Sequence, residues 1–186
     1  AFAEALERAG GDINKIKAVA ITHDHSDHVK GLKPFLNKVK VPLIASEATL
    51  NALCEKGLVP AGTKTIVADN GVEIGDMFID YFKTSHDAPG SGGYVINFSN
   101  GARAAVCTDL GVMNDNIRQK LYGCNALLIE SNHDVEMVRH CSRPESTKLR
   151  ILSDVGHLSN NACAIELPNL LKRGSTRIVL GHLSTE

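Results

Sequence analysis

The chain has 186 residues, of which 43% are hydrophobic and 22% charged, and its 20 Lys and Arg against 21 Asp and Glu give a formal net charge of −1. This composition is typical of a globular protein and excludes a disordered tail or a collagen-like chain. No apolar run approaches the roughly 18 residues of a membrane-spanning helix, which excludes a membrane protein. The charge gives no general attraction to nucleic acid, so a polyanionic substrate would require local cations or bound metals.

The length predicts one domain over residues 1–186. Five widely spaced cysteines, an odd number with no CxxC pair, predict reduced thiols and a cytoplasmic location. No signal peptide is visible, and no obligate protein partner is indicated. Both ends look cut, because the chain opens directly in a helical pattern at Ala1 and stops at Glu186 just after a strand-like run.

The first part of the chain alternates helices and strands. Apolar spacing predicts a helix over residues 2–9 that Gly10-Gly11 stops. A buried strand is expected over 16–21, a loop over 23–28, a helix over 29–39 with Pro34 near its start, and a second strand over 41–45. Ser46 is a good N-cap for a helix to about residue 54.

The middle of the chain is rich in short strands. They are expected over 65–67, 72–74, 77–83, 93–98 and 102–107, with a hairpin at Asn100-Gly101. A helix over 114–122, a strand over 126–130, a helix over 160–172 that Pro168 kinks or ends early, and a strand over 178–180 follow. This order predicts a layered α/β fold with largely mixed or antiparallel sheets.

The strongest chemical signal is the HxHxDH run from His23 to His28, directly after a buried strand. In an extended segment His23 and His25 project to the same side and can reach one metal ion. Asp27 and His28 break that period and can point to a second ion where the chain turns into a helix. Imidazole and carboxylate together suit zinc, manganese or iron.

Three further candidates each lie at or just past the end of a predicted strand. They are His86, Asp109 and His182. Sites in α/β sheets are commonly built at the carboxyl ends of strands.

With this motif set the sequence resembles the metallo-β-lactamase superfamily. The resemblance implies a four-layer αββα sandwich. It implies that His23, His25 and His86 bind a first metal, that Asp27, His28 and His182 bind a second, and that Asp109 bridges them. Two such ions, zinc or manganese, can hold a bridging hydroxide and clamp a phosphate or carbonyl oxygen.

A closer resemblance is to the YycJ/WalJ-like branch of that superfamily, bacterial proteins regarded as DNA exonucleases. It is carried by Glu130-Ser131-Asn132-His133-Asp134, by Gly156-His157-Leu158-Ser159-Asn160, by Gly181-His182-Leu183-Ser184 with Glu186, and by His86-Asp87-Ala88 with Gly92-Gly93-Tyr94. Members of the branch carry a strand pair before the first helix and further elements after the last segment. The resemblance therefore implies a sandwich incomplete at its N- and C-terminal edges.

Asp27, His133 and His157 are the candidate catalytic residues. In this superfamily Asp27 would also orient, or accept a proton from, the nucleophilic water. His133 follows a strand and could donate a proton to the leaving oxygen, or could be a hydrogen-bonded residue that supports the metal ligands. His157 precedes a helix start whose free N–H groups could seat a phosphate, or it could be a residue of the capping loop.

The densest positive segment contains Arg139, Arg143, Lys148 and Arg150 against Glu145. It could follow a nucleic-acid backbone or be a solvated surface face.

These features predict a dinuclear metal-dependent phosphodiesterase that acts on nucleic acid, most simply a DNA exonuclease. The main alternative is hydrolysis of a small ester, thioester or lactone, since the same metals can polarise a carbonyl. A di-iron redox protein would carry Glu in place of His25, and a metal-binding module without catalysis is disfavoured by intact Asp27 and Asp109.

Overall fold

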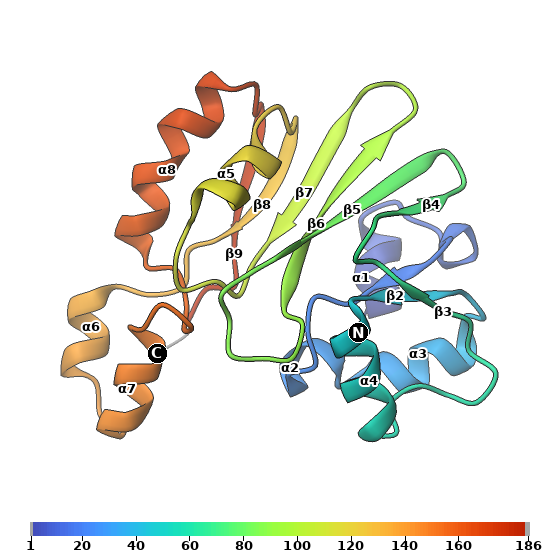
Figure 1. The fold of residues 1–186 in the computed structure, drawn as a ribbon, viewed down its shortest axis with the longest axis horizontal. Helices are drawn as coiled ribbons and strands as arrows, with labels where there is room; N and C mark the ends of the chain where they lie inside the picture. Colours follow the sequence, from blue (N-terminus) through green and yellow to red (C-terminus); the bar gives the residue numbers. More distant parts are fainter. Residues whose placement is uncertain (1, 185–186) are drawn as a thin grey trace.

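This computed structural model describes residues 2–184. They fold into two β-sheets with helices on their outer faces (Figure 1). The three-stranded sheet contains β1 (Val19–Ala20), β2 (Leu43–Ala45) and β3 (Thr65–Val67), all parallel. The six-stranded sheet contains, in order, β4 (Val72–Ile74), β5 (Met77–Lys83), β6 (Gly92–Phe98), β7 (Arg103–Cys107), β8 (Ala126–Glu130) and β9 (Arg177–Gly181). Its strands pair antiparallel from β4 to β7 and parallel from β7 to β9.

The helices form the two outer layers. They are α1 (Phe2–Arg8), the 3₁₀ helix η1 (Ile13–Lys15), α2 (Ser26–Val29), α3 (Leu32–Lys38), α4 (Glu47–Glu55), α5 (Asp115–Leu121), α6 (Val135–His140), α7 (Glu145–Ile151) and α8 (Asn160–Lys172). Helices α2 to α4 lie beside the small sheet, and α5 and α8 cover the far face of the large one (Figure 1).

Strand β2 shows how the layers are held together. Neighbouring residues of a strand point to opposite faces. Leu43 packs with Leu36 and Leu53 of the helices, whereas Ile44 packs with Ile79 and Tyr94 of the large sheet. The small sheet is thus buried on both faces, which confirms the αββα sandwich.

The large sheet buries its other face under α5 and α8. Cys107 and Ile129 on the sheet pack in one cluster with Ile117 of α5 and Leu170 of α8. The cluster places the ends of β7 and β8 in a rigid, apolar setting, which positions the loops that follow them.

Several elements differ from the sequence-based expectations. The small sheet is parallel rather than mixed, because each of its strands is joined to the next through helices. Strand β1 has only two residues, the loop expected over 23–28 already contains most of α2, and the helix expected over 29–39 is the shorter α3. Helix α8 runs through Pro168 to its end, so the expected break there is wrong.

Other expectations are confirmed. Ser46 caps α4 by accepting from the Thr49 N–H. The β6–β7 hairpin turns at Asn100-Gly101, where Gly101 has a φ of 82° that favours glycine. Helices α6 and α7, between β8 and α8, have no counterpart in the sequence-based elements.

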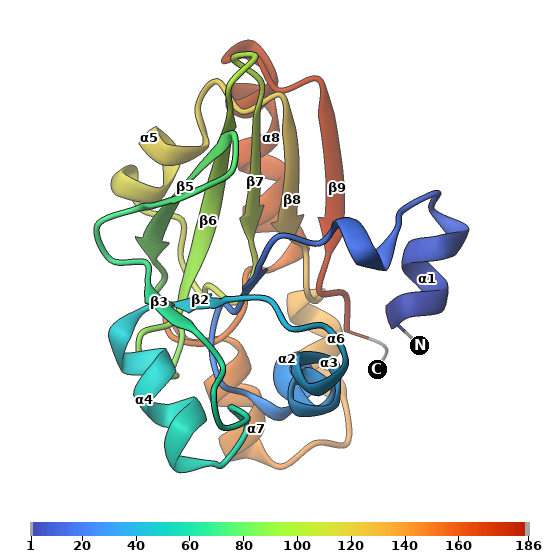
Figure 2. The ribbon, with the colours of Figure 1, turned by 90° about the vertical axis from the view of Figure 1, so that its right-hand side faces the viewer.

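The edges of the sheets are β1 in the small one and β4 and β9 in the large one, and Figure 2 shows β9 on the same side as α1. Val179 and Leu180 of β9 are 60% and 45% exposed. Among the described residues, no helix combines the length and apolarity needed to cross a bilayer. Glu186, which formed part of the family resemblance, lies outside the described residues.

Candidate metal centre

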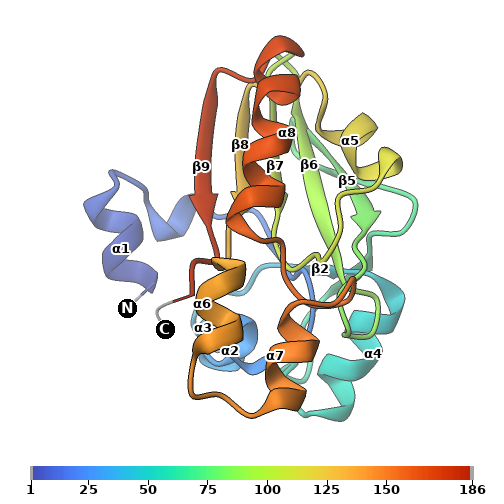
Figure 3. The ribbon, with the colours of Figure 1, turned by 90° about the vertical axis from the view of Figure 1, so that its left-hand side faces the viewer.

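The predicted donor residues meet at one edge of the large sheet. Strands β5, β7, β8 and β9 run in the same direction, so their carboxyl ends lie together, near α6 and α7 (Figure 3). His86 follows β5, Asp109 follows β7 and His182 follows β9, while the HxHxDH segment approaches from β1 of the small sheet.

The HxHxDH segment is anchored to strand β6 of the large sheet. The buried Tyr94 hydroxyl donates to Ile21 O at 2.7 Å, and the Gly92 N–H donates to Thr22 O at 3.1 Å. These bonds fix the chain directly before His23, whose side chain is fully buried. His25 has extended backbone and precedes α2, so the segment turns into a helix at Ser26, three residues earlier than expected.

The first donor group consists of His23, His25 and His86, whose nearest ring nitrogens all lie within 4.8 Å of one another. His86 Nε2 is 3.2 Å from His25 Nδ1. His86 Nδ1 is 3.0 Å from Gly156 O. Because a carbonyl can only accept, Nδ1 carries the proton and Nε2 presents a lone pair to the group.

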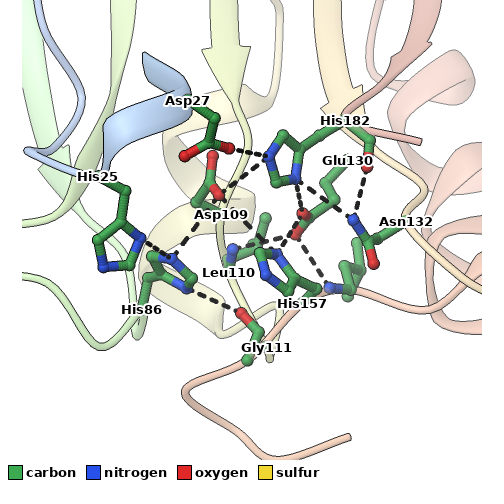
Figure 4. A network of polar contacts seen from close by, with 12 residues as sticks. His25, Asp27, His86, Asp109, Leu110, Gly111, Glu130, Asn132, His157 and His182 are labelled. Atoms are coloured by element: carbon green, nitrogen blue, oxygen red, sulfur yellow. Dashed lines mark hydrogen bonds and ion pairs between the residues drawn. The ribbon is translucent and has the colours of Figure 1, made fainter. Parts of the chain in front are cut away.

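The second donor group consists of Asp27, His28 and His182, again within 4.8 Å. Asp109 lies between the two groups. Its Oδ2 is 3.4 Å from His28 Nε2. Its Oδ1 is 3.4 Å from His182 Nε2 and 3.7 Å from His86 Nε2 (Figure 4). The structure therefore brings together all seven residues predicted as metal ligands.

Backbone strain coincides with this centre. Within residues 2–184, the non-glycine residues with positive φ are Asp109 at 58° and His182 at 54°. The left-handed conformation costs roughly 1–2 kcal/mol for most residues, though less for Asp. Strained residues of this kind concentrate at functional sites, where the surrounding structure holds them in place.

Glu130, the last residue of β8, is the important residue that sequence reasoning missed. It is fully buried, and its Oε1 is 2.7 Å from His182 Nδ1 and 2.9 Å from His157 Nδ1. Its Oε2 accepts from the N–H groups of Leu110 and Leu158. Figure 4 shows His182 between Asp27 and Glu130, with one ring nitrogen facing each carboxylate.

These contacts determine the ionisation of Glu130 and His182. Burial alone would raise the pKa of Glu130, but hydrogen bonds from His157, His182 and the Leu158 N–H lower it to about 2. The hydrogen bond to Glu130 raises the pKa of His182 to about 9 against the effect of burial. Glu130 thus stays ionised and holds the Nδ1 proton of His182, so a metal ion at Nε2 would take the place of the second proton of the ring.

His23 behaves in the opposite way. Burial, followed by the charges of His28, His25 and His86, lowers its pKa to about 3. Its imidazole is therefore neutral at physiological pH, the form in which histidine coordinates a metal ion.

His157 joins the centre, whereas His133 does not. His157 Nδ1 is 3.8 Å from Asp109 Oδ1, and its ring lies between those of His86 and His182. His133 is buried next to Asn132, and no potential metal-binding group among the described residues includes it. Its proton-donor role stays a prediction.

The phosphate seat expected at the start of α8 stays a prediction, and three N–H groups there already have acceptors. The Leu158 N–H donates to Glu130, the Asn160 N–H to His133 O, and the Ala162 N–H to the Ser159 hydroxyl.

The donors present fit divalent metal ions. Imidazole and carboxylate groups converge from separate loops, and such donor sets bind zinc, manganese or iron. In addition, His23 Nε2 and Asp109 Oδ2 are buried without a hydrogen-bond partner in residues 2–184. Buried polar atoms are rarely left without a partner, and both of these face the cluster where an ion would satisfy them.

Comparisons with known proteins agree with this geometry. Residues 2–183 match the model of the β-lactamase superfamily domain. The chain is 38% identical to the exodeoxyribonuclease YycJ of Bacillus anthracis, an alignment covering 98% of this chain and 70% of that protein. It is 36% identical to the exodeoxyribonuclease WalJ of Streptococcus pneumoniae, covering 92% of this chain and 65% of that one.

A solved structure shows the same fold. The metallo-β-lactamase fold protein YhfI of Bacillus subtilis superimposes with a TM-score of 0.67 at 17% identity, over 99% of this chain and 71% of that one. The sandwich, the seven converging donors and the family match together lead to one conclusion: this chain belongs to the metallo-β-lactamase superfamily, in the group of the YycJ and WalJ proteins.

Proposed function

We propose that the chain is a dinuclear metal-dependent phosphodiesterase that acts in the cytoplasm as a DNA exonuclease. The observation that carries the proposal is Asp109, whose two carboxylate oxygens lie between two donor groups, near His86 on one side and His28 on the other. A two-metal site of this kind stabilises both the attacking and the leaving oxygen of an in-line displacement at phosphorus. The relatives YycJ and WalJ, both named exodeoxyribonucleases, support DNA as the substrate.

The ligand sets follow from the donor groups. His23, His25 and His86 would hold one ion, and Asp27, His28 and His182 the other, with Asp109 shared by both. The ions would be zinc or manganese, since both accept imidazole and carboxylate ligands. When bound, they would polarise a phosphoryl oxygen and lower the pKa of a water molecule to near neutral.

Asp27 is suited to accept the proton of the attacking water. Its carboxylate is 65% exposed and 3.6 Å from His182 Nε2. It is therefore the acidic donor that both borders the cluster and faces solvent, whereas Asp109 is buried.

His157 is suited to donate a proton to the leaving oxygen. Its Nδ1 is 2.9 Å from the fully buried Glu130 carboxylate, which fixes the ring and leaves Nε2 for the substrate. The structure favours His157 over His133 for this role, because the ring of His157 contacts those of His86 and His182.

The test is cleavage of end-labelled duplex and single-stranded DNA with added manganese or zinc, beside matched RNA and lactone controls. We expect metal-dependent shortening of the DNA that EDTA prevents and that Asp27→Ala abolishes, with the label giving the direction. Intact DNA in the presence of two bound ions per chain would contradict the proposal, and turnover of the lactone would then favour carbonyl hydrolysis.

A further inference from the structure

Two cations pair with acids that directly follow metal-ligand histidines. Lys56 pairs with Asp24, which follows His23, and Arg150 pairs with Asp87, which follows His86. Asp24 is buried and Lys56 also donates to its carbonyl, so that pair holds the HxHxDH segment in place. The Asp87 side chain is 30% exposed, so the second pair lies at the surface beside the site.

A single carboxylate oxygen, Asp87 Oδ1, lies between Arg150 and the first donor group. Arg150 Nε and Nη2 donate to the two oxygens of Asp87, with Nη2 at 2.8 Å from Oδ1. The same Oδ1 is 3.6 Å from His86 Nε2, the nitrogen that faces the cluster.

The segment that carries Arg150 is held firmly against the site. Two carbonyl groups that follow α7 accept hydrogen bonds from the loop of the site. Val155 O accepts from the Asp87 N–H, and Gly156 O accepts from His86 Nδ1. Gly156 packs so closely that an added Cβ would lie 2.1 Å from Arg150 O. Arg150 is therefore fixed in position before any substrate arrives.

Most of the guanidinium is still available. Arginine has five N–H donors, of which Asp87 takes two, and the others have no partner within residues 2–184. The side chain is 46% exposed, and a surface ion pair adds little stability. Two other cations of the positive segment bond within the α6–α7 pair of helices: Arg139 pairs with Glu136, and Lys148 donates to Arg139 O.

We propose that Arg150 binds the nucleic-acid backbone phosphate next to the one that is cleaved, on the His25–His86 side of the site. This inference rests on the proposed function. A strand carries one phosphate per nucleotide, so a strand with its scissile phosphate at Asp109 has the next phosphate one nucleotide further along, where Arg150 and Asp87 border the first donor group. The planar fork of arginine suits such an oxyanion. Arg150 is a positioning residue that gives preference to polynucleotides over isolated phosphodiesters.

The test compares Arg150→Gln with Asp87→Asn and the parent chain. On single-stranded DNA we expect Arg150→Gln to raise KM about tenfold with a smaller change in kcat. Cleavage of bis(p-nitrophenyl) phosphate, which has one phosphate, should fall far less than cleavage of DNA. In the inactive Asp27→Ala background, anisotropy of a labelled oligonucleotide should show a salt dependence shallower by about 0.7, the contribution of one phosphate contact.

Arg177, an exposed residue at the far end of β9 from His182, provides the matched control, and Arg177→Gln should leave the salt dependence unchanged. Equal losses on both substrates in Arg150→Gln and Asp87→Asn would show that the pair only supports His86, and would overturn the proposal. So would an unchanged salt dependence in Arg150→Gln, or a parent chain that does not bind the oligonucleotide. Binding without cleavage would contradict the proposed function but not the phosphate contact.

Discussion

At the residue scale, Glu130 links the parts of the site that come from β8, from β9 and from the start of α8. It receives hydrogen bonds from two histidines that lie 27 and 52 residues further along the chain. A carboxylate that orients a ligand histidine in this way raises the basicity of the ring nitrogen facing the metal.

We expect Glu130→Gln to weaken metal binding by about 10–100-fold, because the neutral amide no longer holds His182 and His157 in the required orientation. Metal titration by calorimetry measures the change. The control is Glu166→Gln, which removes another buried carboxylate, paired with Arg118 and not with the site. Equal metal affinity in Glu130→Gln and the parent chain would contradict the orienting role.

The sequence allowed the seven donors to be predicted because each stands in a recognisable context. The HxHxDH run is local, and His86, Asp109 and His182 each follow a strand. Glu130 could not be assigned in the same way. A carboxylate at the end of a buried strand acquires its role only from the partners that the fold brings to it, here His157 and His182.

At the element scale, strand β6 acts as the connection between the sheets. It contributes the Tyr94 hydroxyl and the Gly92 N–H to the backbone just before the HxHxDH segment. Neither bond forms part of the donor cluster, yet both fix the position of the backbone from which the His23 side chain enters it.

Tyr94→Phe should lower the free energy of unfolding by about 1–2 kcal/mol, because Ile21 O loses its donor in a buried setting. Urea denaturation of the metal-free chain measures this, with Tyr122→Phe as a control of the same chemistry outside the inter-sheet layer. A loss no greater than that of the control would show that the bond contributes nothing.

Gly156→Ala tests the packing of the loop after α7. An added Cβ would lie 2.1 Å from Arg150 O and 2.3 Å from Ile151 O, so the loop that bonds His86 must shift. We expect lower stability, by roughly 1–3 kcal/mol as for other overpacked positions, together with weaker metal binding. Gly31→Ala, where nothing lies within 4 Å of the new Cβ, should change neither, and equal behaviour of the two variants would refute the packing argument.

Strong local patterns identified most elements, and tertiary contacts determined the rest. The Asn100-Gly101 hairpin and the Ser46 cap follow from turn and cap chemistry alone. Helices α6 and α7 have six and seven residues, and Val138 is the one residue buried in them, so neither carries an apolar period that sequence analysis could detect. Helix α8 continues past Pro168 because Cys163 and Leu170, on either side, are buried against the sheet.

At the scale of the whole molecule, the donor cluster lies where the two sheets meet. The HxHxDH segment follows β1 of the small sheet, whereas His86, Asp109 and His182 follow strands of the large one, so a bound ion would join the two halves of the sandwich. Binding to the folded form alone raises stability by an amount that depends on the ion concentration relative to Kd.

Removing metal with EDTA should therefore lower Tm, and adding zinc or manganese at about 100 times Kd should raise it by roughly 5–10 °C for a chain of this size. Differential scanning calorimetry measures both. Asp109→Asn should reduce the shift, since Asp109 lies between the donor groups. A Tm that is the same with and without metal would mean that the ions do not stabilise the native state.

The donors extend from residue 23 to residue 182, across almost the whole chain. Contacts so distant in sequence give the centre a high contact order and form slowly, because long loops must close first. Until β9 has paired with β8, His182 is absent from the centre and the second donor group is incomplete. Full metal coordination is thus a late step of folding, and the colour of a spectroscopic ion such as cobalt, added during refolding, would report the moment at which the native topology is complete.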